Sequence, residues 1–164
     1  MQIVMQLMSN LHHLGVFKMF NIPKHIQAKA LSFQAQQTDP ISVFIYDLEA
    51  LQRHVQKLVE SLPPRISLYY AIKANSETAI LNTLAPLVDG FEISSGGEIA
   101  KTQQCKHIKP FIFSGPGKLD SDLNAAIANN VEFIHVESLN EIRRINQIAS
   151  TQNKQQDILI RINP

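Results

Sequence analysis

The sequence predicts an α/β protein made of successive parallel strand–helix units. Short apolar segments rich in β-branched and aromatic residues alternate with longer helical patterns over most of the chain. Alternation of this kind is typical of folds with a parallel sheet. Chemically useful side chains lie at or just beyond the carboxyl ends of the predicted strands, at Lys73, Glu92, Ser114, Glu137 and Arg161. In barrels of parallel strands, functional groups gather at these carboxyl ends.

The predicted elements follow one another from residue 41 onward. A strand at residues 41–46 precedes a helix that begins after Asp47, a good N-cap residue, and ends at Pro63 and Pro64. The apolar runs predict further strands at residues 66–72, 88–93, 111–113, 133–136 and 158–162. Helices are expected at about residues 77–84, 97–104, 121–129 and 139–149, the third with Leu123, Ala126 and Ile127 facing inward.

Residues 1–40 are expected to form a separate helical or extended segment ahead of a domain at residues 41–164. Apolar residues near the N-terminus come close to helical spacing, at Leu7, Leu11, Leu14, Phe17 and Met19. Residues 1–20 should therefore form an amphipathic helix that packs on a domain or a partner. The segment lacks the basic start and cleavage site of a signal peptide, and its apolar run is too short to span a bilayer.

Composition excludes several classes of function. The net charge is +1, 18% of the residues are charged, and no block of like charge occurs, so neither nucleic acid nor a membrane surface is expected as a partner. Cys105 is the only cysteine, which excludes an internal disulfide and is compatible with the cytoplasm. We interpret it as a partly buried small hydrophobe on a helix. His12 and His13 point in different directions on a helix, so no metal site is expected.

Lys73 is the residue that most directly suggests chemistry. It stands at the exit of the apolar strand predicted at residues 66–72. A buried lysine must be paired, lose its proton or be consumed covalently, and the last two make it a good Schiff-base nucleophile. In the alternative interpretation, its stem lies along apolar surface and its head reaches solvent at the strand end. Spacing alone favours that alternative.

A series of short motifs changes this balance. They occur in the order Tyr46–Leu48, Tyr70–Asn75, Gly90–Ser95 with Gly97 and Glu98, Ser114–Lys118, His135–Ser138 and Arg161–Pro164. Together they resemble the pyridoxal-phosphate-dependent decarboxylases of the diaminopimelate and ornithine decarboxylase family, of fold type III. The segment Lys73–Glu77, a glutamate at position 92 and the segment Ser114–Lys118 look most like the decarboxylases of siderophore pathways, of the staphyloferrin B type.

The resemblance implies an alanine-racemase-like (β/α)₈ barrel of TIM type. A closed barrel takes about 250 residues, so the 164 residues of this chain should form an incomplete barrel that stops after about five barrel strands. We therefore expect the N-terminal part of a longer enzyme that works as a homodimer. By the same resemblance, the phosphate-binding glycine loop, the carboxylate for the pyridine nitrogen and the partner's cysteine loop lie beyond Pro164. The isolated chain is then expected to be inactive.

The resemblance also implies roles for four residues. Lys73 matches the lysine that binds pyridoxal 5'-phosphate (PLP) covalently, and Ala71 matches a position with a small side chain near the cofactor ring. Arg161 matches an arginine close to the cofactor. Glu92 matches a position that is usually aspartate in ornithine decarboxylases, beside the reacting carbon. Glu92 is expected either to assist catalysis or to form only a local salt bridge.

Several alternatives remain open from the sequence. The substrate is an amino-acid-type small molecule, either a siderophore intermediate or diaminopimelate for lysine synthesis. A regulatory or binding relative could keep the fold without catalysis, and a cofactor-free protein could use Lys73 in an aldolase-like reaction. The glycine turn at residues 114–118 could cradle a phosphate, but a tight turn with Pro116 is favoured because the spacing of a nucleotide P-loop is missing.

Overall fold

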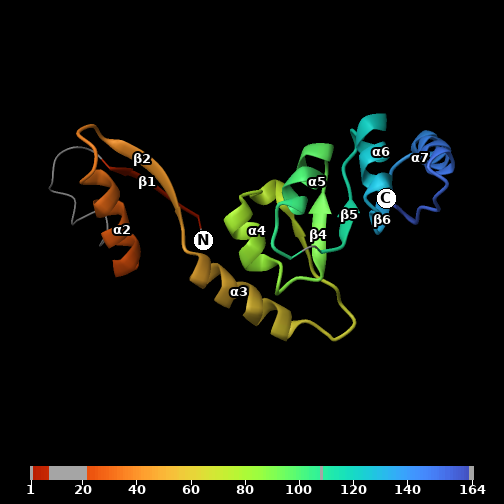
Figure 1. The fold of residues 1–164 in the computed structure, drawn as a ribbon. Helices are drawn as coiled ribbons and strands as arrows, with labels where there is room; N and C mark the ends of the chain where they lie inside the picture. Colours follow the sequence, from red (N-terminus) through yellow and green to blue (C-terminus); the bar gives the residue numbers. More distant parts are fainter. Residues whose placement is uncertain (1, 8–21, 108, 163–164) are drawn as a thin grey trace. The chain divides into compact units, whose positions relative to one another are not determined.

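The computed structural model describes residues 2–7, 22–107 and 109–162 (Figure 1). The chain divides into two compact units, residues 1–51 and residues 52–164. This division falls after the strand at residues 41–46, whereas the sequence-based boundary falls before it. The domain boundary predicted from the sequence therefore stays a prediction, and each unit is described by itself.

The described residues of the first unit form a two-stranded antiparallel sheet and one complete helix. Strand β1 (Gln2–Leu7) pairs with β2 (Ile41–Tyr46), and helix α2 (Lys24–Gln34) lies between them in the chain. A small core is formed by Ile22, Ile26, Ala30 and Ile45. The predicted helix over residues 1–20 is wrong at residues 2–7, because these residues pair with a strand that is distant in the sequence. Residues 8–21, with His12 and His13, lie outside the described residues.

Helix α3 (Leu48–Ser61) begins where the sequence predicts. The Oδ1 atom of Asp47 accepts a hydrogen bond of 2.9 Å from the backbone N–H of Ala50. Such a bond satisfies one of the donors that a helix N-terminus leaves free. The helix ends shortly before Pro63, which cannot continue it without losing a backbone hydrogen bond.

The second unit is a five-stranded parallel sheet in which the order of the strands equals their order in the chain. The strands are β3 (Tyr69–Ala71), β4 (Gly90–Ile93), β5 (Phe111–Phe113), β6 (Phe133–Val136) and β7 (Ile158–Ile160). The helices after the first four are α4 (Thr78–Leu84), α5 (Gly96–Gln103), α6 (Asp120–Ala128) and α7 (Leu139–Thr151). Because each crossover moves one strand in the same direction, right-handed connections put all these helices on one face.

One face of this sheet carries the core. Alternate strand residues are almost fully buried, among them Phe91, Ile93, Phe113, Ile134 and Val136. They pack with residues from the helices, including the predicted inward residues Leu123, Ala126 and Ile127. The residues between them in the strands point to the opposite face and are only half-buried, as Glu92, Ile112 and His135 show. In the barrel that the sequence predicts, that opposite face would be the inner face of the wall.

The amino ends of the strands are tied together by Tyr69. Its hydroxyl donates a hydrogen bond to the carboxylate of Glu132, which precedes β6. Burial and this carboxylate raise the pKa of Tyr69 to about 12. Gly90 lies between them, and a Cβ atom there would lie 2.6 Å from the carbonyl oxygen of Pro110 and overlap the Tyr69 ring. Glycine is therefore required where the ring crosses β4.

Candidate active site

The carboxyl ends of the five parallel strands surround an open pocket of about 560 Å³. Lys73 follows β3 in a single 3₁₀ turn (Ile72–Ala74), Glu92 lies in β4, and Arg161 follows β7. The residues that line the pocket are Lys73, Glu92, Ser114, Gly115, Pro116, His135, Leu159, Ile160 and Arg161. Three of the four residues predicted for the site therefore face one pocket, although they are far apart in the sequence.

Lys73 points into this pocket with most of its side chain accessible. The side chain is 64% exposed, and its Nζ atom lies 3.8 Å from Oε1 of Glu92. The lysine is thus a solvent-reachable amine next to one carboxylate. The apolar strand does not bury it, because Ile72 takes the buried position and the 3₁₀ turn carries Lys73 past the end of the sheet.

Glu92 connects two of the strand ends. Its Oε1 atom accepts a hydrogen bond from the hydroxyl of Ser114 and also faces Lys73. The side chain is 26% exposed, which keeps the carboxylate accessible from the pocket. The salt-bridge partner of Glu92 is thus Lys73 itself, so a local salt bridge and the predicted role beside the Lys73 amine are compatible with each other.

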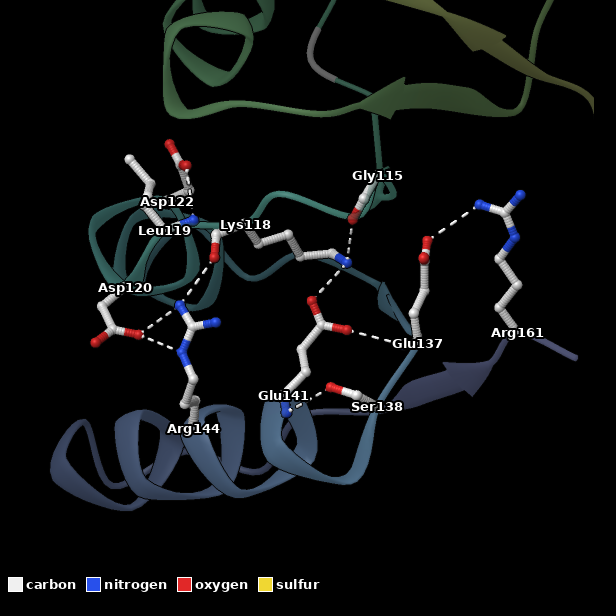
Figure 2. Close-up of polar contacts among 10 residues, drawn as sticks. All are labelled: Gly115, Lys118, Leu119, Asp120, Asp122, Glu137, Ser138, Glu141, Arg144 and Arg161. Atoms are coloured by element: carbon white, nitrogen blue, oxygen red, sulfur yellow. Dashed lines mark hydrogen bonds and ion pairs between the residues drawn. The ribbon is translucent and has the colours of Figure 1, made fainter. Parts of the chain in front are cut away.

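Arg161 is held at the other side of the pocket by Glu137. Its Nη1 atom donates a hydrogen bond of 3.0 Å to Oε1 of Glu137 (Figure 2). Its backbone N–H bonds to the carbonyl oxygen of Val136 at 2.9 Å, which continues the ladder between β6 and β7. About half of the guanidinium side chain, 54%, is exposed. Arg161 therefore presents fixed N–H donors to any anion that enters the pocket.

Ala71 occupies a different position from the other predicted residues. It pairs in register with Glu92 and is half-buried, but it does not line the pocket. Neighbouring residues in register point to the same face of a sheet. Ala71 consequently lies on the same face of the sheet as Glu92, two residues before Lys73 in the chain. Its small side chain leaves space on that face next to the pocket.

His135 was not among the residues predicted for the site, yet it lines the pocket. It is half-buried, between the buried residues Ile134 and Val136 of β6. The period-2 alternation of β6 could have placed it on the inner face, since the two apolar neighbours must face the helices. The imidazole adds ring nitrogens that can donate or accept a hydrogen bond at the pocket wall.

The segment at residues 114–118 is a turn between β5 and α6, as the sequence favoured. Gly115 has a φ of +102°, a backbone conformation that suits glycine. Lys118 does not point to the pocket but is buried, with its Nζ atom 2.8 Å from Oε1 of Glu141. The only lysine of this turn is therefore engaged within the protein and does not serve a phosphate cradle.

Other features of the described residues add no site. Cys105 is buried, where partial burial was expected, and it lies just after α5 rather than on it; burial raises the pKa of its thiol. Among residues 2–7, 22–107 and 109–162, no group of His, Cys, Asp and Glu side chains is arranged to hold a metal ion. Within the same ranges, no helix has the length and hydropathy needed to cross a membrane.

Comparisons with known proteins agree with this geometry. Residues 48–164 match the family model of the pyridoxal-dependent decarboxylases, pyridoxal binding domain. The chain belongs to this family. Its members are PLP-dependent carboxy-lyases, and the matched region contains all the pocket residues described above.

Individual relatives are similar over the same region. The chain is 46% identical over 127 residues to the 2-[(L-alanin-3-ylcarbamoyl)methyl]-2-hydroxybutanedioate decarboxylase of Staphylococcus aureus, covering 77% of this chain and 32% of that protein. It is 35% identical over 126 residues to the diaminopimelate decarboxylase of Vibrio cholerae, covering 74% and 30%. The chain thus spans about a third of the length of these curated relatives.

A solved structure confirms the predicted fold class. The diaminopimelate decarboxylase of Helicobacter pylori, complexed with L-lysine, is 37% identical to the chain, with a TM-score of 0.64. The similarity covers 73% of this chain and 31% of that one. The described residues accordingly form five parallel strands of a (β/α) barrel, as the alternation of apolar runs and helical patterns predicts.

The pocket residues fit the cofactor of this family. A primary amine that reaches the pocket, at Lys73, is the group needed to bind the PLP aldehyde covalently. The guanidinium of Arg161 is suited to an anionic oxygen, and the pocket volume is in the range of small-molecule sites. The donor set of the described residues therefore agrees with a pyridoxal site.

Proposed function

We propose that the intact protein is a PLP-dependent decarboxylase of an amino-acid-type intermediate in siderophore biosynthesis. The observation that carries this proposal is the gathering of Lys73, Glu92 and Arg161 around one pocket at the carboxyl ends of the strands. The activity is proposed for the whole protein, because the similar region makes up only 32% of the Staphylococcus aureus relative. The family resemblance also supports a homodimer as the working form.

Each of the proposed site residues has a role that follows from its position. Lys73 would hold PLP through its primary amine and would give up that place to the amine of the substrate. When bound, PLP withdraws electrons from the bonds of the substrate Cα, so that the carboxylate can leave as carbon dioxide. Arg161 holds an anionic oxygen, and the small side chain of Ala71 leaves space for the ring.

Glu92 is proposed to act on the lysine amine and not only to neutralise it. Its carboxylate lies 3.8 Å from Nζ of Lys73 and is held in place by the Ser114 hydroxyl. A carboxylate this close to an amine can take up or return a proton when the groups bonded to that nitrogen change. Glu92 is therefore placed to move a proton during the exchange between Lys73 and the substrate amine.

The substrate class follows from the relative with 46% identity. Its name describes an alanine unit joined through an amide to a hydroxybutanedioate, which is an α-amino acid with additional carboxylates at the far end. We propose a substrate of this class for the present protein. The second candidate is diaminopimelate, favoured by the 35% identity to the Vibrio cholerae enzyme.

The test is a comparison of substrates with the purified intact protein and PLP. Carbon dioxide release is measured with 2-[(L-alanin-3-ylcarbamoyl)methyl]-2-hydroxybutanedioate and with diaminopimelate at equal concentrations. We expect a higher kcat/KM for the first compound. A preference for diaminopimelate would instead assign the protein to lysine synthesis. PLP binding without turnover of either compound would indicate a regulatory or binding relative.

A further inference from the structure

Lys118 and Glu141 form a buried ion pair beside the candidate active site. The Lys118 side chain is 0% exposed, and its ammonium group donates to the carbonyl oxygen of Gly115 at 2.5 Å and to Oε1 of Glu141 at 2.8 Å (Figure 2). Glu141 is itself 5% exposed. The pair therefore links the turn after β5 to the first turn of α7.

Glu141 also holds the backbone of Glu137, which lies two residues before α7. Its Oε2 atom accepts a hydrogen bond of 2.8 Å from the backbone N–H of Glu137, and its own N–H donates to the Ser138 hydroxyl at 3.1 Å. The backbone of Glu137 is thus fixed by a carboxylate that is locked from the other side by Lys118. Figure 2 shows these contacts in one series.

The series of contacts ends at Arg161 in the pocket. The carboxylate of Glu137 accepts the hydrogen bond of 3.0 Å from Nη1 of Arg161. The two side chains are 23% and 54% exposed, and an ion pair this accessible contributes only about 0–1 kcal/mol by itself. Such a pair orients Arg161 well only if the backbone of Glu137 is held rigidly.

The turn between β4 and α5 shows that a helix can begin with the same local hydrogen bonds without a buried lysine beside its glutamate. After β4, Ser95 accepts a hydrogen bond from the N–H of Glu98, and the Glu98 carboxylate accepts one of 2.6 Å from the N–H of Ser94. This is the same local pattern, yet Glu98 is only half-buried. Burying Glu141 against Lys118 therefore adds a constraint beyond helix capping.

We propose that the Lys118–Glu141 pair is a positioning element that, through Glu137, orients Arg161 to bind an anionic oxygen of PLP. Replacing buried ion pairs by apolar residues is often neutral for stability, so such a pair is better explained by the geometry it imposes. This inference rests on the proposed function, in which Arg161 contacts the cofactor. Neither Lys118 nor Glu141 touches the cofactor in it.

The test is a double-mutant cycle on cofactor affinity in the intact protein. The dissociation constant of PLP is measured by equilibrium dialysis for the wild type, Glu141→Gln, Arg161→Met and the double variant. We expect Glu141→Gln and Arg161→Met each to raise the constant about tenfold. In the Arg161→Met background, Glu141→Gln should have no further effect, because its action passes through Arg161.

Asp120→Asn is the matched control. Asp120 in α6 pairs with Arg144 in α7 at 2.7 Å, so this pair joins the same two helices, but Asp120 is 68% exposed. The variant removes one charge and none of the side chains of Lys118, Glu141, Glu137 and Arg161, and Arg144 still has the carbonyl oxygen of Lys118 as a partner at 2.8 Å. We expect its PLP dissociation constant to stay within about twofold of the wild type. A loss as large as that of Glu141→Gln would overturn the inference.

The remaining outcomes separate the inference from the proposed function. The inference is overturned if Glu141→Gln leaves the affinity unchanged, or weakens it equally in both backgrounds. It is also overturned if Arg161→Met does not change the affinity, while PLP absorbance that depends on Lys73 would still support the proposed function. Absence of PLP binding to the wild type would contradict both the inference and the proposed function. If Glu141→Gln does not fold, Glu137→Gln tests the last link and should give the same tenfold loss; an unchanged affinity there contradicts the inference.

Discussion

Lys73 and Lys118 both follow strands of the same parallel sheet, but their environments are opposite. The Lys73 side chain is 64% exposed, and its nearest carboxylate, Glu92, is 3.8 Å away. The Lys118 side chain is completely buried, with Glu141 at 2.8 Å and the carbonyl oxygen of Gly115 at 2.5 Å. The two residues differ in what remains available to each amine.

This difference shows that the lysine predicted to be reactive is not the buried one in this sheet. Taking an ammonium group out of water is costly unless a counter-charge and hydrogen bonds replace the water. Lys118 has both, so its amine is fully engaged by the protein. Lys73 has a single long contact and access to the pocket, and that is the condition an amine needs to meet an aldehyde. The rule that a buried lysine needs a partner therefore describes Lys118, which is buried and paired, and not Lys73, which is exposed.

The largest effect is expected for Lys73→Ala. Decarboxylation by the intact protein should fall at least roughly 10⁴-fold, because the group that binds the cofactor is lost. The free energy of unfolding should change by no more than about 0.5 kcal/mol, since the side chain is largely exposed. Turnover and urea unfolding measure the two effects separately.

Lys73→Arg is the matched variant for this change. It keeps the positive charge next to Glu92 but removes the primary amine. An equal loss of turnover would mean that the amine is needed for covalent chemistry, whereas substantial activity would mean that only its charge matters. Retained turnover in Lys73→Ala would refute the role of this residue altogether.

A smaller effect, on stability rather than chemistry, is expected for Lys118→Met. The variant leaves the Glu141 carboxylate buried without its counter-charge, which typically destabilises a protein by about 3–5 kcal/mol. Urea unfolding should therefore show a lower midpoint. The double variant Lys118→Met/Glu141→Leu should recover most of the loss, because it removes both charges. A Lys118→Met protein as stable as the wild type would show that the pair is not buried in solution.

The smallest effect is expected for Glu92→Gln. The contact of Glu92 with Lys73 is long and accessible, so its loss should change the free energy of unfolding by at most about 1 kcal/mol. Turnover should fall roughly 10²-fold, the contribution typical of a group that holds or transfers a proton. Measurements of kcat and of unfolding test this together. Unchanged turnover would leave Glu92 with only a local salt bridge.

Local patterns were sufficient to predict most of the second unit. Strands β5 and β6 lie at the predicted residues. A short apolar run between turn residues is typical of a buried strand, so the local sequence is enough to locate it. Strand β3 is shorter than predicted: residues 66–68 stay outside the ladder, and the N–H of Leu68 bonds instead to the Asp89 side chain at 2.7 Å. Strand ends are set by such contacts with distant residues, which a local pattern does not contain.

The errors and omissions occur where a distant partner decides the structure. Residues 2–7 were expected in a helix because apolar residues from Leu7 to Met19 come close to helical spacing, but pairing with β2 makes residues 2–7 a strand. His135 was not singled out, although alternation along β6 places it on the inner face. The roles of Lys73, Glu92, Ala71 and Arg161 in binding or catalysis stay predictions, while three of the four do line one pocket.

The amino-acid sequence was enough to establish the strand–helix alternation, the family and the position of Lys73 at a strand end, because periodicity, caps and short motifs are properties of neighbouring residues. Only the tertiary structure distinguishes an available lysine from an engaged one. Lys118 and Glu141 are 23 residues apart in the chain. Their pairing depends on how β5 and β6 lie side by side in the sheet, and that arrangement arises from packing of the whole unit.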